Sequence, residues 1–230
     1  MEEVEAACRK DGRTHLTEWE TYAILRQWHI PVAIGMLVQT PEEAAAAAAV
    51  IGGPVAVKVV SPDIPHKTEV GGVRLAISGG ARVARETTDL LSSVGRKLPR
   101  ARIHGVLIQQ MAPKGVELIA SGMHDPAFGP VVMAGLGGLF TEVLKDVVFR
   151  LAPIGISDAL EMLAGLKGSA LLHGVRGRPA VDQAALAQVI VNLSRLVADW
   201  PNLRELELNP LIAWEGGVVA VDALASLKES

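Results

Sequence analysis

A short apolar run with one charged residue inside it limits the folds open to this chain more than any other feature. Residues 54–60 read Pro-Val-Ala-Val-Lys-Val-Val, a β-branched run that is typical of a strand buried on both faces. A lysine buried at Lys58 must find an anion or bear a large desolvation cost. Two interpretations stay equally open. Lys58 holds a phosphate from a rigid strand, or it lies on an edge strand where its ammonium reaches water.

Helix and strand signals alternate over the first hundred residues, after a polar stretch at 1–16 that we expect to form a loosely held arm. Thr17 with Glu20, and Thr40 with Glu43, are capping boxes and predict two helix starts. Further elements follow from apolar periodicity. Strands are predicted at 31–38, 54–60 and 73–77, and an amphipathic helix is predicted at 81–98.

Strands dominate the remainder of the chain. Residues 106–110 and 116–120 are predicted to pair with each other, and residues 203–213 and 218–221 are predicted to form a hairpin. The other predicted elements are strands at 129–134 and 147–151 and helices at 157–173 and 182–199. The whole pattern predicts an α+β fold with two lobes. The smaller lobe covers 17–100 and the larger, mostly antiparallel lobe covers 101–230, with the site expected in the cleft between them.

Charge and cysteine content exclude several classes of function. The formal net charge is −3 and the basic residues are scattered, which gives no electrostatic case for nucleic acid or anionic lipid as the main partner. Cys8 is the only cysteine, so an intrachain disulfide and a zinc site of several thiolates are excluded. The N-terminus is acidic, unlike a signal peptide, and no uncharged apolar run reaches about 18 residues. We therefore expect a cytoplasmic protein that does not enter a membrane.

The loop after the lysine-bearing strand combines a histidine, a lysine, hydroxyls and two glycines over residues 61–72. Backbone next to glycine can approach a phosphate closely. His66 has the chemistry of a general base, a metal ligand or a nucleophile that takes up phosphate. For a single histidine, however, a solvent-exposed loop position is the commoner explanation. A second glycine-rich segment, Gly135–Gly138, is weak evidence for phosphate binding, since it fits neither common phosphate-loop motif.

The predicted hairpin gives a geometric argument for a metal site. Strand alternation places Glu207 and Asn209 on one face of the first strand, opposite the leucines between them. If Trp214 to Gly217 form a four-residue turn, counting back places Asn209 opposite Asp222. Hard oxygen ligands in small number suit Mg²⁺ that is shared with phosphates. The alternative is a polar outer face of a half-solvated hairpin. Glu117, in another apolar strand, could bind a ribose or pair with a buried lysine.

Several segments in this order resemble the ATP-grasp beta subunits of ADP-forming acetyl-CoA (acyl-CoA) synthetases, which are related to the beta subunit of succinyl-CoA synthetase. The resemblance runs from about Leu16 to about Ala225. The segments that carry it are Val57-Lys58-Val59, 66–73, Asp125-Pro126-Ala127-Phe128-Gly129-Pro130, 135–138, 146–153, Gly174-Val175-Arg176-Gly177 and Glu207-Leu208-Asn209-Pro210-Leu211.

The resemblance implies an ATP-grasp fold with ATP or ADP in the cleft between its lobes, and it assigns roles by position. The implied nucleotide ligands are Lys58 at the phosphates, Gln110 and Met111 at the adenine hinge, and Glu117 at the ribose. The implied Mg²⁺ ligands are Asn209 and Asp222, with Glu207 beside them. His66 matches the position of a second phosphohistidine, which relays phosphate to ADP in the reaction acyl-CoA + ADP + phosphate giving acid + CoA + ATP. A mobile loop is expected to carry the phosphoryl group between sites.

The resemblance also implies a partner, because the chain contains no CoA-binding module and no domain for the first phosphohistidine. We expect an acetate–CoA ligase (ADP-forming) beta subunit that needs an alpha subunit carrying both, in an α2β2 assembly. Two alternatives remain. One is a stand-alone ATP-grasp ligase that uses an acyl phosphate. The other is a non-catalytic nucleotide-sensing or assembly module of an acyltransferase-type complex.

Overall fold

The structure is a computed structural model that describes residues 1–138, 146–175, 177 and 179–229. The chain forms two compact units. Unit 1 comprises Met1–Val32 and Ala112–Ser230, and unit 2 comprises Ala33–Met111. These units differ from the expected lobe boundaries at 16 and 100. Residues up to Val32 belong to unit 1, and the last strand of unit 2, at Gly105–Gln110, lies wholly beyond residue 100.

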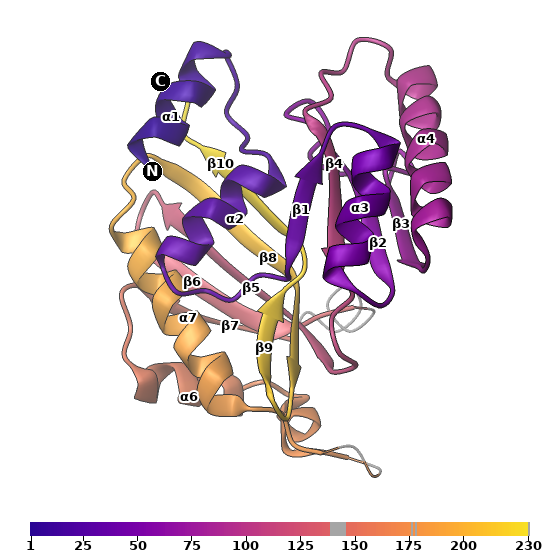
Figure 1. Cartoon of the computed structure of the whole chain (residues 1–230). Coiled ribbons are helices and arrows are strands. Elements are labelled where there is room, and N and C mark those ends of the chain that lie inside the picture. The colour runs from indigo at the N-terminus through magenta and orange to yellow at the C-terminus, as the bar shows by residue number, and fades with distance from the viewer. Residues whose placement is uncertain (139–145, 176, 178, 230) are drawn as a thin grey trace. The chain divides into compact units, whose positions relative to one another are not determined.

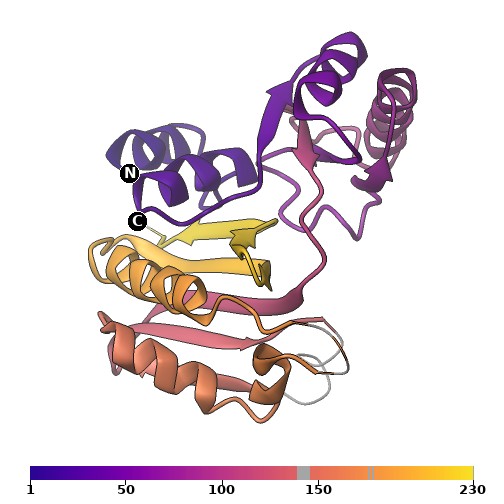
Figure 2. The same cartoon turned by 60° about the horizontal axis from the view of Figure 1, so that its bottom comes forward.

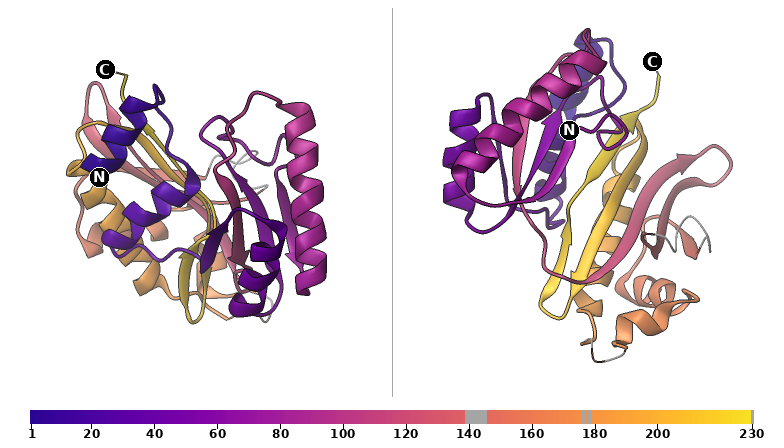
Figure 3. Two further views of the ribbon diagram at one scale, coloured as in Figure 1. Left: turned by 45° about the horizontal axis from the view of Figure 1, so that its top comes forward. Right: turned by 90° about the vertical axis from the view of Figure 1, so that its right-hand side faces the viewer.

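Unit 2 is a four-stranded antiparallel sheet with the order β1-β4-β2-β3. The strands are β1 (Gly35–Val38), β2 (Val55–Val60), β3 (Val73–Ile77) and β4 (Gly105–Gln110). Helices α3 (Pro41–Ile51) and α4 (Gly80–Lys97) lie side by side against this sheet (Figure 3). Every second residue of β2 joins the hydrophobic core under these helices, beginning with Val55.

Unit 1 is built on a six-stranded antiparallel sheet with the order β10-β8-β5-β6-β7, and β9 pairs with β8 (Figure 1). Its strands are β5 (Val116–Asp125), β6 (Gly129–Leu136), β7 (Val147–Leu151), β8 (Leu203–Trp214), β9 (Gly217–Ala220) and β10 (Ala223–Leu227). Helices α6 (Ile156–Ala164) and α7 (Gln183–Ala198) run along the sheet (Figure 2). Between them lies a short 3₁₀ turn, η1 (Ser169–His173). The predicted helix at 157–173 is thus interrupted.

The capping boxes start helices where the sequence predicts them. Helix α2 (Glu18–Gln27) begins after Thr17, and α3 begins after Thr40. In both helices the threonine side chain accepts a backbone N–H while the glutamate three residues on reaches back to the cap.

Among the described residues, no helix is long and apolar enough to cross a membrane.

The expected loose arm at 1–16 contains helix α1 (Glu2–Lys10), which is held in place by side chains. Both carboxylate oxygens of Glu5 accept hydrogen bonds, one from the indole of Trp200 and one from Asn202 at 2.8 Å. Cys8 is fully buried, and this burial raises the pKa of its thiol. Composition did not reveal this attachment, because most of the residues of the helix are polar.

The predicted pairing of 106–110 with 116–120 is also wrong. Strand β4 lies between β1 and β2 in unit 2, whereas β5 lies between β6 and β8 in unit 1. The short connection between the two strands passes from one unit to the other, and so it does not form a hairpin. Sequence proximity favoured a hairpin because neighbouring strands usually pair.

Candidate functional site

Lys58 lies on an interior strand, which removes the edge-strand explanation for its charge. Strand β2 pairs with β4 on one side and with β3 on the other, and Lys58 is only 5 % exposed. Its neighbours Val57 and Val59 point into the helix-covered core. Lys58 therefore projects from the opposite face of the sheet, where the register places Leu107 directly across from it.

The same face carries a residue that the sequence analysis missed. Gln109 lies opposite Ala56, two residues along β2 from Lys58, and it is only 1 % exposed. Gln110 lies opposite Val55, so its side chain belongs to the other face. A role of Gln110 and Met111 at an adenine ring would thus use backbone groups. The backbone N–H of Gln110 donates to the carbonyl oxygen of Ile34 at 2.8 Å. The backbone N–H of Met111 donates to the carbonyl oxygen of Pro54 at 3.4 Å.

His66 lies in the loop that connects β2 to β3, and its side chain is exposed. Ile64, two residues before His66, is 4 % exposed and belongs to the hydrophobic core of unit 2. The following Lys67 is 7 % exposed, and its carbonyl accepts the N–H of Gly72 at 2.7 Å. Gly72 has no room for a side chain, because a Cβ there would lie 2.6 Å from Val59. The loop therefore exposes the imidazole of His66, while Ile64, Lys67 and Gly72 around it are packed against unit 2.

The hairpin of β8 and β9 has the register that the four-residue turn predicts. Ala213 lies opposite Val218, and the same register resumes where β10 pairs with β8. Between these pairs, the N–H of Asn209 donates to the carbonyl of Asp222 at 3.1 Å. Asn209 and Asp222 therefore lie opposite each other, as counted from the sequence.

The three predicted metal ligands are neighbours in the sheet, with Glu207 and Asn209 two residues apart on β8 and Asp222 opposite Asn209, and we call them the oxygen-rich group. The amide of Asn209 donates to Oε1 of Glu207 at 2.9 Å, which fixes the orientation of the Asn209 side chain. Oδ1 of Asp222 accepts the N–H of Ala223 at 2.9 Å. In the described part of the chain, no group of three or more His, Cys, Asp or Glu side chains could hold a metal ion. Two carboxylates and one amide suit a hard cation that takes its remaining ligands from phosphates and water.

These residues share a face of the unit 1 sheet with Glu117. On the other face, Gly122 of β5 approaches α7 so closely that a Cβ would lie 2.2 Å from Val197. Strand alternation then places Glu117 of β5, and Glu207 and Asn209 of β8, on the face turned away from α7. We call this the polar face of unit 1. Glu117 is exposed there.

Packing accounts for the glycines at 135–138. Gly137 donates its N–H to the carbonyl of Glu117 at 2.8 Å, and a Cβ on Gly137 would lie 3.0 Å from that backbone. Gly138 has φ +66° and lies close to the Glu117 carboxylate. Gly137 and Gly138 thus pack directly against Glu117, the residue predicted to bind a ribose. Residues 139–145 and Arg176 lie outside the described residues.

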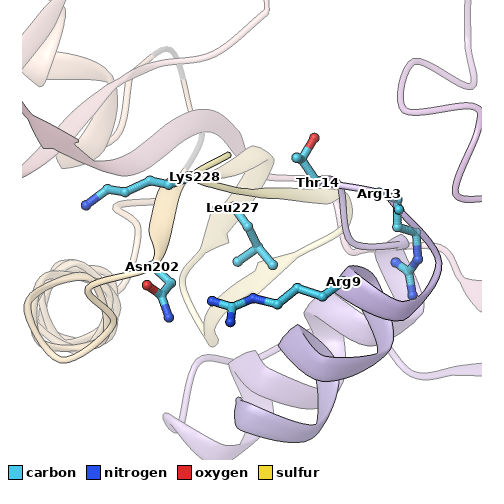
Figure 4. Close-up of a pocket in the computed structure, with 7 residues that line it drawn as sticks. Arg9, Arg13, Thr14, Asn202, Leu227 and Lys228 are labelled. Atoms are coloured by element: carbon cyan, nitrogen blue, oxygen red, sulfur yellow. The ribbon is translucent and has the colours of Figure 1, made fainter. Parts of the chain in front are cut away.

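A separate pocket of about 240 Å³ lies in unit 1 near both chain ends (Figure 4). Its lining residues are Arg9, Gly12, Arg13, Thr14, Asn202, Leu227 and Lys228. The cations around it already have partners. Arg13 binds Glu20 at 2.6 Å, and Lys228 donates to the carbonyl of Pro201 at 2.6 Å. None of the predicted site residues lines this pocket, and we assign it no chemistry.

Comparison with known proteins agrees with the fold. A family model described as the ATP-grasp domain matches residues 7–227. The beta subunit of acetate–CoA ligase (ADP-forming) I from Pyrococcus furiosus is 41 % identical over 208 residues, which are 90 % of each chain. The 4-hydroxybutyrate–CoA ligase (ADP-forming) of Nitrosopumilus maritimus is 39 % identical over 91 % of this chain. The match spans only 30 % of that longer enzyme.

Solved structures of acetyl-coenzyme A synthetase 1 from Ca. Korarchaeum cryptofilum match nearly the whole chain. The complex with coenzyme A and Ca-AMPCP has a TM-score of 0.95 at 38 % identity, and the match covers 98 % of this chain and 99 % of that one. A complex with coenzyme A and Mg-AMPPCP, whose phosphohistidine segment points towards the nucleotide site, has a TM-score of 0.86 at 35 % identity, with the same coverage. The chain belongs to the ATP-grasp family, and within it to the nucleotide-binding beta subunits of ADP-forming acyl-CoA synthetases.

Proposed function

We propose that the chain binds ATP or ADP with Mg²⁺ and transfers a phosphoryl group between the nucleotide and His66. The observation that carries this proposal is the group formed by Glu207, Asn209 and Asp222, two carboxylates and an oriented amide on a rigid sheet. Hard oxygen donors at neighbouring positions on one face of a sheet suit a cation that is shared with phosphates.

The remaining roles follow the chemistry of each side chain. Lys58 binds the nucleotide phosphates as a point charge from a rigid strand, and its 5 % exposure means that little water competes for that charge. The backbone at Gln110 and Met111 borders the adenine, and Glu117 accepts hydrogen bonds from the ribose. Preorganised charges at a transferring phosphoryl group supply most of the rate acceleration in such reactions.

The oxygen-rich group fits Mg²⁺ better than a softer metal. Its donors are carboxylate and amide oxygens, and among described residues they include no sulfur and no imidazole. Because Glu207 holds the amide nitrogen of Asn209, the Asn209 oxygen is the atom left to face a cation. When bound, the ion neutralises charge on the phosphate oxygens.

The chemical step at His66 is an in-line transfer. In one direction, an imidazole nitrogen forms a bond to the γ-phosphorus of ATP, the bond to the bridging oxygen breaks, and ADP leaves. In the other direction, phosphohistidine at His66 donates its phosphoryl group to the terminal oxygen of ADP. Because the imidazole of His66 is exposed, it can accept a phosphoryl group from ATP or from a phosphate donor on a partner chain.

We further propose that the chain acts with an alpha subunit that carries the CoA site and the first phosphohistidine, in an α2β2 assembly. The Pyrococcus furiosus relative is named as a subunit beta, and acetate is the acid in its name. The Nitrosopumilus maritimus relative is named for 4-hydroxybutyrate. We take acetate as the first acid to test.

Labelling with γ-³²P-ATP and Mg²⁺ tests the proposal on the purified chain. We expect acid-labile phosphate on the wild type and none on His66→Ala, with peptide mapping placing the label at His66. His104→Ala is the matched control, since His104 is also exposed on unit 2, and this variant should label like the wild type.

Two results would contradict the proposal. Nucleotide binding without any labelled histidine would remove the phosphoryl relay. Full activity of the complex with an alpha subunit when His66→Ala is used would favour a non-catalytic nucleotide-sensing or assembly module.

A further inference from the structure

The loop that bears His66 is anchored on its C-terminal side by cationic side chains. Lys97 of α4 donates from Nζ to the carbonyl of Val70 at 2.9 Å. Arg74 of β3 donates to the carbonyl of Gly71 at 2.7 Å. Because charge-assisted hydrogen bonds are stronger than neutral ones, this half of the loop is fixed to the helix and the strand that follow it.

One residue makes the corresponding polar attachment on the N-terminal side. The carboxylate of Asp63 accepts three hydrogen bonds from Arg102, which lies 39 residues further along the chain. The backbone N–H of Arg102 donates at 2.7 Å, and two guanidinium nitrogens donate at 3.1 and 2.7 Å. The fork geometry of the guanidinium fixes the direction of the carboxylate as well as its distance.

Asp63 is three residues before His66, and only Ile64 and Pro65 separate them. Ile64 is inserted in the core of unit 2, so its position depends on the direction in which the backbone leaves Asp63. Arg102 belongs to the connection between α4 and β4, and β4 is the strand directly across from Lys58. The contact thus ties the His66 loop to the strand pair that carries the proposed phosphate ligand.

We propose that Asp63 and Arg102 form a positioning pair that sets the place of His66 relative to the nucleotide phosphates. The proposal rests on the phosphoryl-transfer function proposed above.

The pair acts through geometry more than through stability. The Asp63 and Arg102 side chains are 32 % and 47 % exposed, and exposed ion pairs contribute little to folding. By contrast, a misplacement of about 1 Å in a reacting group can lower a rate by about a hundredfold. Loss of the pair should therefore slow the phosphorylation of His66 clearly and change the melting temperature little.

The experiment compares His66 phosphorylation in five variants of the full chain at saturating γ-³²P-ATP and Mg²⁺. Asp63→Ala and Arg102→Ala should each lower the rate about tenfold, and the double variant should be no slower than either. Asp63→Asn keeps an acceptor for the Arg102 N–H and should retain more activity than Asp63→Ala. Arg82→Ala is the matched control, because it breaks an exposed ion pair of unit 2 with Glu86 and should leave the rate unchanged.

The dissociation constant for ATP, measured by calorimetry, separates positioning from general damage and should stay within twofold of the wild type in every variant. The inference is overturned if Asp63→Ala phosphorylates like the wild type, if the losses multiply in the double variant, or if ATP binding weakens in parallel. In each of these cases a labelled wild type leaves the proposed function intact. A wild-type chain that binds ATP without labelling His66 overturns both.

Discussion

At the residue scale, the burial of Lys58 predicts how one substitution changes both ATP binding and stability. Lys58→Met keeps the length of the side chain and removes a charge that is only 5 % exposed. We expect the affinity for ATP to fall by about 10- to 100-fold, the loss of one charged hydrogen bond. The free energy of unfolding without nucleotide should fall as well, because Lys58 has an interaction within the fold that the substitution removes.

Calorimetric titration with ATP and urea unfolding of the free chain measure these two quantities. Lys114→Met is a suitable control, since Lys114 is exposed between β4 and β5. Unchanged ATP affinity in Lys58→Met would show that this ammonium serves the fold and not the nucleotide.

The Asp63–Arg102 contact predicts a pH dependence at a single carboxyl group. Hydrogen bonds from the Arg102 side chain and backbone lower the pKa of Asp63 to about 2. The contact therefore adds to the free energy of unfolding at pH values above the unfolded pKa of about 3.9. This contribution is lost as the pH falls through about 2. A carboxyl NMR titration should place the midpoint near 2 in the wild type and nearer 3.9 in Arg102→Ala. Equal midpoints in both proteins would contradict the contact.

At the element scale, the packing of α7 on the unit 1 sheet depends on a glycine. A Cβ at Gly122 would lie 2.2 Å from Val197 of α7. Gly122→Ala should therefore lower the free energy of unfolding by about 1–3 kcal/mol, the usual cost of overpacking. Gly95→Ala is the control. Gly95 lies on an exposed turn of α4 with no neighbour within 4 Å, and alanine there should stabilise by roughly 0.5–1 kcal/mol.

Urea unfolding followed by circular dichroism measures both substitutions. The packing of α7 would need another explanation if Gly122→Ala unfolded at the same urea concentration as the wild type. A loss of stability in Gly95→Ala would instead point to a contact of α4 that the structure does not show.

Local signals predicted the elements well and their long-range pairing less well. The capping boxes at Thr17 and Thr40 start helices, and the turn at Trp214–Gly217 sets a register that reaches Asp222. Each of these features depends on residues close together in sequence. The pairing of β4 and the division into units depend on contacts between distant segments, which no local pattern specifies.

The candidate site was predictable to the same extent. Glu207, Asn209 and Asp222 could be placed together because alternation and one turn relate them. Gln109 was missed, although alternation along 105–110 would have paired it with the Lys58 face once β4 was known to lie beside β2. The attachment of α1 through Glu5 was missed because its partners are almost 200 residues away.

At the scale of the whole molecule, the proposed ligands come from both units, so one nucleotide should stabilise both against unfolding. Ligand that binds only the folded chain adds about 2.7 kcal/mol at a hundred times its dissociation constant. Hydrogen exchange should therefore slow in the sheets of both units when ATP and Mg²⁺ are added to the wild type. Lys58→Met in unit 2 and Asp222→Asn in unit 1 should each reduce the protection in both sheets.

Removal of Mg²⁺ with a chelator separates the two contributions. It should weaken the protection of the wild type strongly and that of Asp222→Asn little, because the variant has already lost a ligand to the ion. Lys58→Met should keep its Mg²⁺ dependence. If each substitution instead altered protection only within its own unit, the two groups of side chains would not act on the same nucleotide. The assignment of Lys58 and Asp222 to one site would then be wrong.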